Sequence, residues 1–426
     1  MSIPIDNYTK FMAKHLEKIG SLAIQKEAEL EKAYFEKYYP IYELAFQFLK
    51  KEKVLAYGGY AINEILPKES RFYGDAELPD IDVFCPYAKT LSEKAVRFFK
   101  RHGFLQASSM DALHENTFKV MVSGLQVLDI THVSKKAYEN LKMYAVKTSH
   151  GIWTTNPQFL RMTLHMLLSQ PVDIHRWTKI FERLVAFYKA FPPSECSFQV
   201  QKSVSSEVMK SIDPAFEIIE NVSLDWVRNE GYVVFSPIHI VQNLPPRNTY
   251  VARVRSILPS QAPLEVLVDT ANKSLESIAK EWYANIKHEL KNNGQVSLKS
   301  LKVSKVVNEM SPLISPYVYI YYDKKPVIGL FTTSACVSYV AIESKKSIKM
   351  ASIQTLLRTY LQMWLSKSDN VDLNRMECIM NLLSLLSIRS IMSSRNPLLR
   401  SFVLTCYGSQ PGMATLKRER YERKKK

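Results

Sequence analysis

Apolar side chains recur every three to four positions among charged ones across residues 8–50, which is the pattern of an amphipathic helix. Leu44 and Phe48 belong to this series. Pro40 falls within the pattern, and we expect a new helix to begin there, because proline is tolerated in a first turn but breaks a helix interior. The pattern therefore predicts an N-terminal helical region over residues 1–50.

Short apolar runs bounded by turn residues follow, which is typical of strands that alternate with loops and helices. Strands are predicted at residues 54–56, 81–84, 117–122 and 125–133, and helices at 60–66 and 90–101. Thr90-Leu91-Ser92-Glu93 fits a capping box for the second helix, and Ser123-Gly124 fits a two-residue hairpin turn. Residues 67–79, rich in proline, glycine and charge, predict a loop.

The rest of the chain mixes the same two patterns. Helical periodicity covers residues 158–169 and 174–191, and Pro192-Pro193-Ser194 then marks a domain boundary. Beyond this boundary, strands are predicted at 232–235, 264–268, 317–322 and 327–331, and helices at 351–366 and 373–392. We therefore predict an α+β protein with four parts: an N-terminal helical region (1–50), a first domain (51–193), a second, α/β domain (194–400) and a basic tail (401–426).

The length and composition set limits on the class of protein. A chain of 426 residues suggests two or three domains. The first ten residues lack the apolar segment of a secretory signal, and no apolar run approaches the ~20 residues of a membrane span. Five cysteines are scattered without a CxxC pair, at positions Cys85, Cys196, Cys336, Cys378 and Cys406. This spacing indicates a reducing compartment and argues against structural zinc or a disulfide framework.

The charge balance points to a polyanionic partner. The chain has 57 lysine and arginine residues against 41 aspartate and glutamate residues, a net charge of +16. Nucleic acid is favoured over a membrane surface, since no basic amphipathic anchor is evident, although many basic proteins bind no nucleic acid.

Three acids carry the candidate chemistry. Asp80 and Asp82 stand two residues apart in a β-prone run, so in a strand they share one face at a like-charge cost that a divalent cation relieves. Asp129 lies in a third apolar run, which could pair alongside. Two-metal nucleotidyl transfer needs three carboxylates around two Mg²⁺ or Mn²⁺ ions. We expect Asp129 mainly to hold the ion that activates the attacking hydroxyl, and Asp80 and Asp82 to bridge both ions.

A pair of glycines precedes the acids. Gly58-Gly59 follows a predicted strand and begins a predicted helix, so bare backbone and the helix N-terminus could approach a phosphate closely. A glycine pair alone usually means a turn, and a DxD pair alone is usually exposed. The order strand, GG, helix, loop, DxD strand, hairpin and acid-bearing strand is much more specific.

This order resembles the DNA polymerase β-like nucleotidyltransferase superfamily. Three stretches are similar to the poly(A) polymerase catalytic subunits of large nucleocytoplasmic DNA viruses, with giant-virus, asfarvirus and iridovirus members nearer than poxvirus ones: Tyr57-Gly58-Gly59-Tyr60-Ala61-Ile62-Asn63, Leu78-Pro79-Asp80-Ile81-Asp82-Val83-Phe84 and Asp129-Ile130-Thr131. The resemblance covers roughly residues 54–185. It implies a catalytic nucleotidyltransferase domain over residues 51–193, and a catalytically silent, substrate-holding copy of that fold over 194–400.

The resemblance also suggests nucleotide contacts. Besides the two glycines, these are Tyr60, Asn63, Arg161, Arg176, Lys179 and Arg183. For the four basic residues the alternative is a solvated helix face. Asn63 could hold the neighbouring loop or the nucleotide, and a hydrogen bond on the helix side is the alternative that we favour. Two departures from the family pattern stand out. Tyr60 replaces a common serine, which leaves only a backbone contact to phosphate, and the 67–79 loop is longer than usual.

The resemblance implies ATP as donor, an RNA 3′ end as acceptor, and polyadenylation of viral mRNA. It implies either a homodimer or a separate processivity subunit, and location in the host cytoplasm at the viral factory, with packaging in the virion as a second location. Two alternatives stay open. One is a nucleotidyltransferase that modifies a tRNA end, a protein or a small molecule, and the other is a non-catalytic RNA-binding subunit.

Overall fold

A computed structural model describes most of the chain. The described residues are 5–74, 77–114, 116–194, 196, 214–244, 248–258, 262–294, 300–308, 313–333, 335–342, 347–366, 373–390, 396–409, 415, 417, 418, 421 and 422. Within these ranges, every helix is too short or too polar to cross a membrane.

Contacts within the chain define two compact units. The first contains Met1–His132 and Lys147–Thr154, and the second contains Val133–Val146 and Thr155–Lys426. The sequence places a boundary later, at residues 193 and 194. The difference arises because the helix that begins at Pro157 packs against a helix near the end of the chain. The four-part division remains a prediction.

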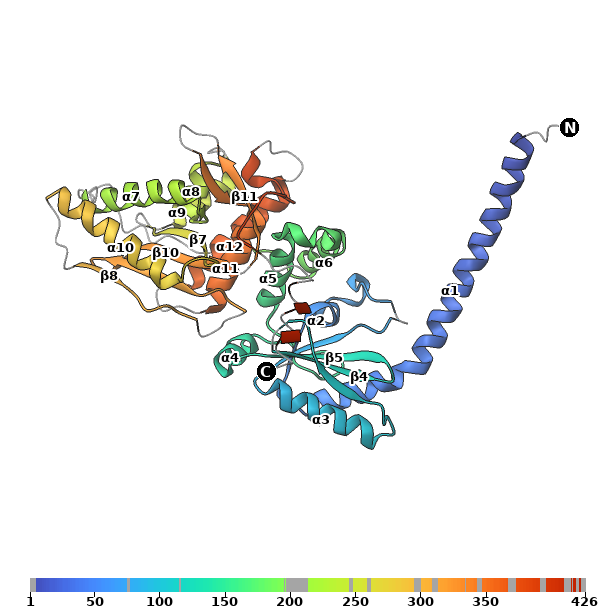
Figure 1. The fold of residues 1–426 in the computed structure, drawn as a ribbon. Helices are drawn as coiled ribbons and strands as arrows, with labels where there is room; N and C mark the ends of the chain where they lie inside the picture. The colour runs from blue at the N-terminus through green and yellow to red at the C-terminus, as the bar shows by residue number, and fades with distance from the viewer. Residues whose placement is uncertain are drawn as a thin grey trace. The chain divides into compact units, whose positions relative to one another are not determined.

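The first unit is built around a five-stranded sheet (Figure 1). Its elements are α1 (Ile5–Leu49), β1 (Leu55–Tyr57), α2 (Gly58–Ile65), the 3-10 helix η1 (Lys68–Ser70), β2 (Ile81–Cys85), α3 (Ala88–Arg101), β3 (Ser108–Asp111), β4 (Thr117–Val122) and β5 (Leu125–His132). The strand order is β1-β2-β5-β4-β3, in which β2 and β5 are parallel and the other neighbours are antiparallel. Helix α3 packs on β2, β4 and β5.

The predicted elements of this unit are present, with two corrections. The hairpin turn is confirmed, because Ser123 and Gly124 both have positive φ values, 51° and 82°. Helix α1 runs through Pro40 without interruption, since the turns after it are held by burial of side chains such as Phe48. Helix α3 begins at Ala88, before the predicted cap, and the Ser92 hydroxyl donates to a carbonyl inside the helix.

The second unit carries an eight-stranded sheet of order β13-β11-β12-β6-β7-β10-β9-β8. Its elements are α4 (Lys135–Lys142), α5 (Pro157–Leu168), η2 (Pro171–Arg176), α6 (Trp177–Ala190), α7 (Pro214–Glu230), β6 (Val233–Val234), α8 (Pro237–Gln242), α9 (Thr249–Ile257), β7 (Leu264–Asp269), α10 (Leu275–Asn292), β8 (Leu301–Val303), β9 (Tyr317–Tyr322), β10 (Lys325–Thr333), β11 (Val337–Ile342), β12 (Ile348–Ala351), α11 (Ile353–Ser366), α12 (Leu373–Ser390), η4 (Pro397–Leu399) and β13 (Cys406–Tyr407).

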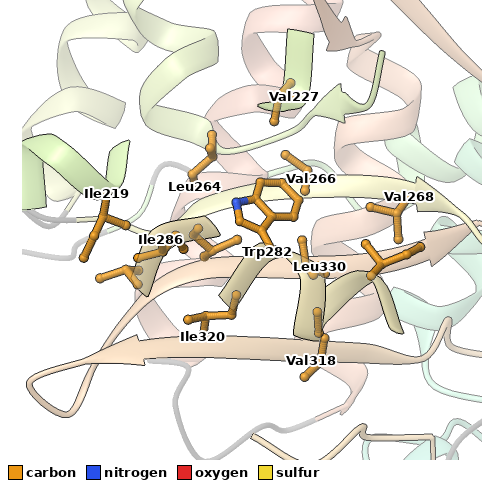
Figure 2. Close-up of a cluster of buried hydrophobic side chains, with 14 of the residues drawn as sticks. Ile219, Val227, Leu264, Val266, Val268, Trp282, Ile286, Val318, Ile320 and Leu330 are labelled. Carbon is orange, nitrogen blue, oxygen red and sulfur yellow. The ribbon is translucent and has the colours of Figure 1, made fainter. Parts of the chain in front are cut away.

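One face of this sheet is sealed by helix α10. Trp282 of α10 is fully buried and lies among Val266, Val268 and Leu330 of the central strands (Figure 2). Its indole nitrogen donates to the hydroxyl of Ser223 on α7 at 3.3 Å, so the one polar group of the ring is satisfied.

The second sheet repeats the topology of the first. In the order β6-β7-β10-β9-β8, the second pair of neighbours is parallel and the other three pairs are antiparallel. The same holds for the order β1-β2-β5-β4-β3. The order along the chain is also the same: strand, helix, strand, helix, then three strands, although α8 is followed by the extra helix α9. The predicted α+β architecture is thus confirmed, and the second sheet repeats the topology of the first.

A buried glutamate occupies the centre of this second copy. Glu265 on β7 points away from the Trp282 cluster, because successive strand residues alternate between faces and Val266 belongs to that cluster. Its carboxylate accepts hydrogen bonds from the hydroxyls of Tyr319 at 3.1 Å and Tyr360 at 3.0 Å. Burial raises the pKa of Glu265 to about 7, and the two tyrosine hydrogen bonds only partly offset this.

The cysteines correct the sequence analysis. Two disulfides join Cys196 to Cys378 and Cys336 to Cys406, with Cα–Cα distances of 5.2 and 5.3 Å, while Cys85 is free and buried. The argument against a disulfide framework was therefore wrong. It failed because the partners are 182 and 70 residues apart, so their proximity depends on the tertiary fold of the second unit.

Glu265→Gln is expected to stabilise the protein above pH 7. The folded-state pKa lies above the unfolded-state value, so the stability that protonated Glu265 contributes is present in full below about pH 4.5 and is lost as the pH rises through about 7. The loss is on the order of 3 kcal/mol at pH 8. Urea denaturation between pH 5 and 8 measures it. The exposed Glu276→Gln serves as the control, and identical pH dependence of both variants would contradict the assignment.

Candidate active site

A row of four residues crosses the first sheet. Tyr57 pairs with Asp82 across β1 and β2, Asp82 with Asp129 across β2 and β5, and Asp129 with Lys119 across β5 and β4. Asp80 precedes β2 by one residue and is exposed. The structure therefore brings two of the three predicted acids side by side and places the third at the start of the same strand.

The second sheet has a matching row without a charged pair. Gly329 pairs there with Glu265 and with Tyr319, and the amide of Phe235 donates to the carbonyl of Glu265 at 2.9 Å. Glycine thus stands where the first sheet has Asp129, and tyrosine stands where it has a lysine.

Lys119 is a site residue that the sequence analysis missed. Its ammonium lies 3.3 Å from Oδ2 of Asp129 and also donates to the side-chain oxygen of Gln126. A lone lysine in a β-prone run carries no signal by itself. Only the register of the β4–β5 hairpin, set by the turn at residues 123 and 124 and by the register shift between Val120 and Met121, shows that it faces an acid.

The carboxylates lie in an environment that disfavours their charge. Burial raises the pKa of Asp129, with a further rise from the charge of Asp80, while Lys119 acts in the opposite direction. The pKa of Asp80 is also raised, because its carboxyl group is partly desolvated although the residue as a whole is exposed, and Lys119 lowers this pKa less strongly. Extra positive charge at this position would therefore stabilise the ionised acids.

The donor set fits hard cations in type. Carboxylate oxygens suit Mg²⁺ and Mn²⁺, and Oδ1 of Asp129 is buried without a hydrogen-bond partner among the described residues. In the part of the chain that the structure describes, no three acid, imidazole or thiol groups yet converge as ligands of one ion. Lys119 occupies the other oxygen of Asp129, so this lysine and an ion would compete for the same carboxylate.

Gly58 is required by the carboxylate behind it. Its φ is +70°, and a Cβ built at this position would lie within 2.4 Å of Oδ2 of Asp82. Helix α2 begins at Gly58, so its first backbone N–H groups have no partner within the helix. The glycine pair that we expect to bind phosphate therefore contacts the strand that carries the acids.

Tyr57 supports the row from β1. Its ring stacks on Phe84 with centroids 3.8 Å apart and planes 6° apart, and its hydroxyl lies 3.0 Å from that of Thr131. Burial, followed by the charge of Asp82, raises its pKa well above the ordinary value, so it remains a neutral phenol.

Tyr60 and Asn63 lie on α2 and have structural partners. The Tyr60 hydroxyl lies 3.1 Å from Nδ1 of His150. The side-chain oxygen of Asn63 accepts the backbone amides of Phe72 at 2.9 Å and Tyr73 at 3.1 Å. Asn63 thus holds the 67–79 loop, which is one of the three roles considered from the sequence, in place of the helix-side hydrogen bond that we favoured.

The four predicted basic contacts belong to the second unit and fall into two classes. Arg176 and Lys179 are exposed around the start of α6. Arg161 and Arg183 are buried, with 3% and 8% exposure, so neither lies on a solvated face. Arg161 donates to Asn381 on α12 at 3.4 Å, and burial lowers its pKa. Its position favours a role in packing, while nucleotide contact by these residues remains a prediction.

The segment that carries the acid row also matches a known protein family. Residues 43–174 match the family model of the poly(A) polymerase catalytic subunit, a range that includes both glycines and all three acids. The resemblance inferred from the motifs is thereby confirmed for this segment.

Individual relatives agree with this match. The chain is 27% identical over 180 residues to a protein of Acanthamoeba polyphaga mimivirus named as a poly(A) polymerase catalytic subunit, a match that covers 41% of this chain and 30% of that protein. It is 28% identical over 143 residues to the protein of the same name from an African swine fever virus isolate, covering 33% and 29%. The chain thus spans less than a third of the length of these relatives in the alignments.

The crystal structure of the Megavirus polyadenylate synthase has the same fold. Its TM-score with this chain is 0.75 at 18% identity, and the match covers 100% of this chain and 84% of that one. The match also covers the part of the second unit beyond residue 174, where the family-model match ends.

Gly58→Ala is expected to lower both stability and any activity of the site. The added methyl must displace Asp82, and alanine also strains the positive φ. We expect a loss of roughly 2 kcal/mol or more, measured by thermal unfolding. Gly124→Ala is the matched control, because its φ of +82° gives similar strain with nothing within 4 Å of the added Cβ. Equal losses in the two variants would show that contact with Asp82 is unimportant.

Lys119→Met is expected to make stability more dependent on divalent cations. Without Lys119 the acid row loses its ion pair to Asp129, which we expect to cost about 1 kcal/mol in EDTA. Added Mg²⁺ should then raise the unfolding temperature more than it does in the wild type, because the ion no longer competes with the lysine.

Lys94→Met is the control for this comparison, since Lys94 pairs with Glu52, outside the row. Equal Mg²⁺ responses in wild type and Lys119→Met would contradict competition between Lys119 and the ion.

Proposed function

We propose that the protein is a template-independent poly(A) polymerase, which adds AMP from ATP to RNA 3′ ends in the maturation of viral mRNA. The observation that carries the proposal is the contact between Gly58 and Asp82 within the row that also contains Asp129. This contact joins the proposed phosphate-binding glycines to the acids, and both lie within the segment that matches the family model.

The proposed reaction transfers a nucleotidyl group. The RNA 3′ oxygen forms a bond to the α-phosphorus of ATP as the bond to the leaving pyrophosphate breaks. Bound Mg²⁺ or Mn²⁺ would supply charge to activate the hydroxyl and to stabilise the leaving group. Asp80, Asp82 and Asp129 would hold the ions. The backbone amides at Gly58 and Gly59, at the N-terminus of α2, would orient the triphosphate.

Partners follow from the same proposal. The excess of basic residues supports binding of the RNA backbone. The matched family is described as a catalytic subunit, which supports a separate partner subunit, and a homodimer is the other arrangement. We propose the host cytoplasm as the place of action.

The first test is substrate choice. Purified protein should extend an oligo(A) primer with ATP in preference to CTP, GTP or UTP, and only when a divalent cation is present. Extension with no nucleotide by well-folded protein would reject the proposal. Transfer to a tRNA end, a protein or a small molecule instead would identify a different acceptor.

Asp82→Asn is expected to abolish extension without unfolding the protein. Loss of one ligand should reduce the extension rate by at least about 100-fold, as for other groups that stabilise transition-state charge. The melting temperature should stay the same or rise, because repulsion with Asp129 is relieved. Primer extension and thermal unfolding measure the two effects. Asp111→Asn, on the exposed edge strand β3, is the control, and unchanged extension in Asp82→Asn would exclude Asp82 as a ligand.

A further inference from the structure

A cavity of about 500 Å³ lies beside the acid-bearing strand in the first unit. One wall is the C-terminal part of α1, a second is α2, and the third is the 67–79 loop in its described residues 67–74 and 77–79. We call this cavity the aromatic pocket, because its lining includes the rings of Phe35, Tyr39, Phe46, Tyr60 and Tyr73. Its volume falls within the range of about 300–1,000 Å³ seen for small-ligand sites.

The rings of the aromatic pocket are partly exposed and ordered by stacking. Phe35 and Tyr39 lie 4.7 Å apart between centroids with planes 27° apart, and both are half-buried on successive turns of α1. Phe46 stacks on His150 with centroids 3.9 Å apart. A planar ligand ring stacks best on aromatic faces that neighbouring side chains already hold in place before binding.

The Glu64 carboxylate of the aromatic pocket is already paired. Arg71 lies 3.5 Å from the Glu64 carboxylate, His150 lies 3.4 Å from it, and the Ser149 hydroxyl donates to it. Burial raises the pKa of Glu64, but these hydrogen bonds and charges outweigh it, and the pKa lies below its ordinary value. The lining holds Lys68 and Arg71 against Glu64 and Glu77, a formal balance of zero. This balance suits a flat uncharged ring better than a phosphate.

The aromatic pocket opens next to the candidate active site. Leu78 and Pro79 line it, and Asp80 is the next residue of the chain. The Tyr42 hydroxyl donates to the Leu78 carbonyl at 3.4 Å, which fixes the end of the loop against α1. Burial and then the charge of Asp80 raise the pKa of Tyr42, which places this wall within the field of the acid.

We propose that the aromatic pocket binds one unpaired nucleobase of the RNA strand whose 3′ end is extended. The inference rests on the proposed function, since it names a contact for that substrate. Aromatic side chains bind unpaired bases of any sequence by stacking on them. Phosphate is bound by positive charge or backbone amides, and the lining of this pocket has no excess of positive charge. The adenine of ATP is the other source of such a ring, and the experiment separates the two. The inserted loop thereby gains a function, as the wall that closes the pocket over α1 and α2.

The test measures RNA binding without ATP or extension. Fluorescence anisotropy would follow a labelled oligo(A) and a series of the same strand with one abasic position moved stepwise from the 3′ end. For the wild type, one position near the 3′ end should raise the Kd about tenfold, within the range that stacking contributes. In Tyr39→Ala the intact strand should bind about tenfold more weakly, and the abasic position should cause no further loss. Tyr73→Ala, on the loop wall, should behave alike.

Tyr38→Ala is the matched control, because Tyr38 lies on the same helix outside the lining. It should bind like the wild type, and thermal unfolding should confirm that all variants are folded. The proposal would be overturned if the abasic position weakened RNA binding equally in the wild type, Tyr39→Ala and Tyr73→Ala. So would unchanged RNA affinity with weakened ATP binding in the two pocket variants, which would assign the ring to ATP. Because binding is read without chemistry, absence of extension would reject the proposed function and leave this result standing.

Discussion

The register between β2 and β5 is the constraint on which the rest of the first unit depends. It sets Asp82 beside Asp129 on parallel strands, where like charges repel in a half-buried setting. Two neighbouring residues accommodate these acids. Lys119 meets Asp129 from the next strand, and Gly58 leaves the space that the Asp82 carboxylate fills. A slip of one residue in either strand would turn its acid and its apolar side chains to the opposite faces, so the site and the hydrophobic core are fixed together.

The second sheet has the same topology without the repulsion between two adjacent acids. Gly329 stands in place of the second acid, and Tyr319 in place of the lysine. The one remaining acid, Glu265, is buried, with its pKa raised to about 7, and two tyrosine hydroxyls satisfy it. One of these is Tyr360 of α11, so a helix residue contacts Glu265 at the position that matches Asp82 in the first sheet. The silent role of the second copy remains a prediction, and the loss of the acid pair supports it.

Sequence reasoning succeeded where the signal was local. The DxD strand, the glycine pair and the Ser123-Gly124 turn each depend on a few adjacent residues, and the structure contains them as predicted. It failed where distant segments meet. Lys119 gains its role only through strand register, Arg161 is buried by a helix 220 positions along the chain, and the disulfide partners are separated by at least 70 residues. Pro40 is the exception, because a local rule was overridden by the packing that follows it.

The two sheets divide stability and chemistry between them. The first retains features that oppose folding: adjacent acids, a glycine at positive φ, and an Asp129 oxygen with no partner within the described residues. Such features persist only where a function needs them and the surrounding structure holds them in place. The second sheet has Gly329 and Tyr319 in place of Asp129 and Lys119, and two tyrosine hydroxyls satisfy its buried Glu265. The contrast between two copies of one topology therefore supports the prediction that the first carries the site, and this support does not depend on similarity to other proteins.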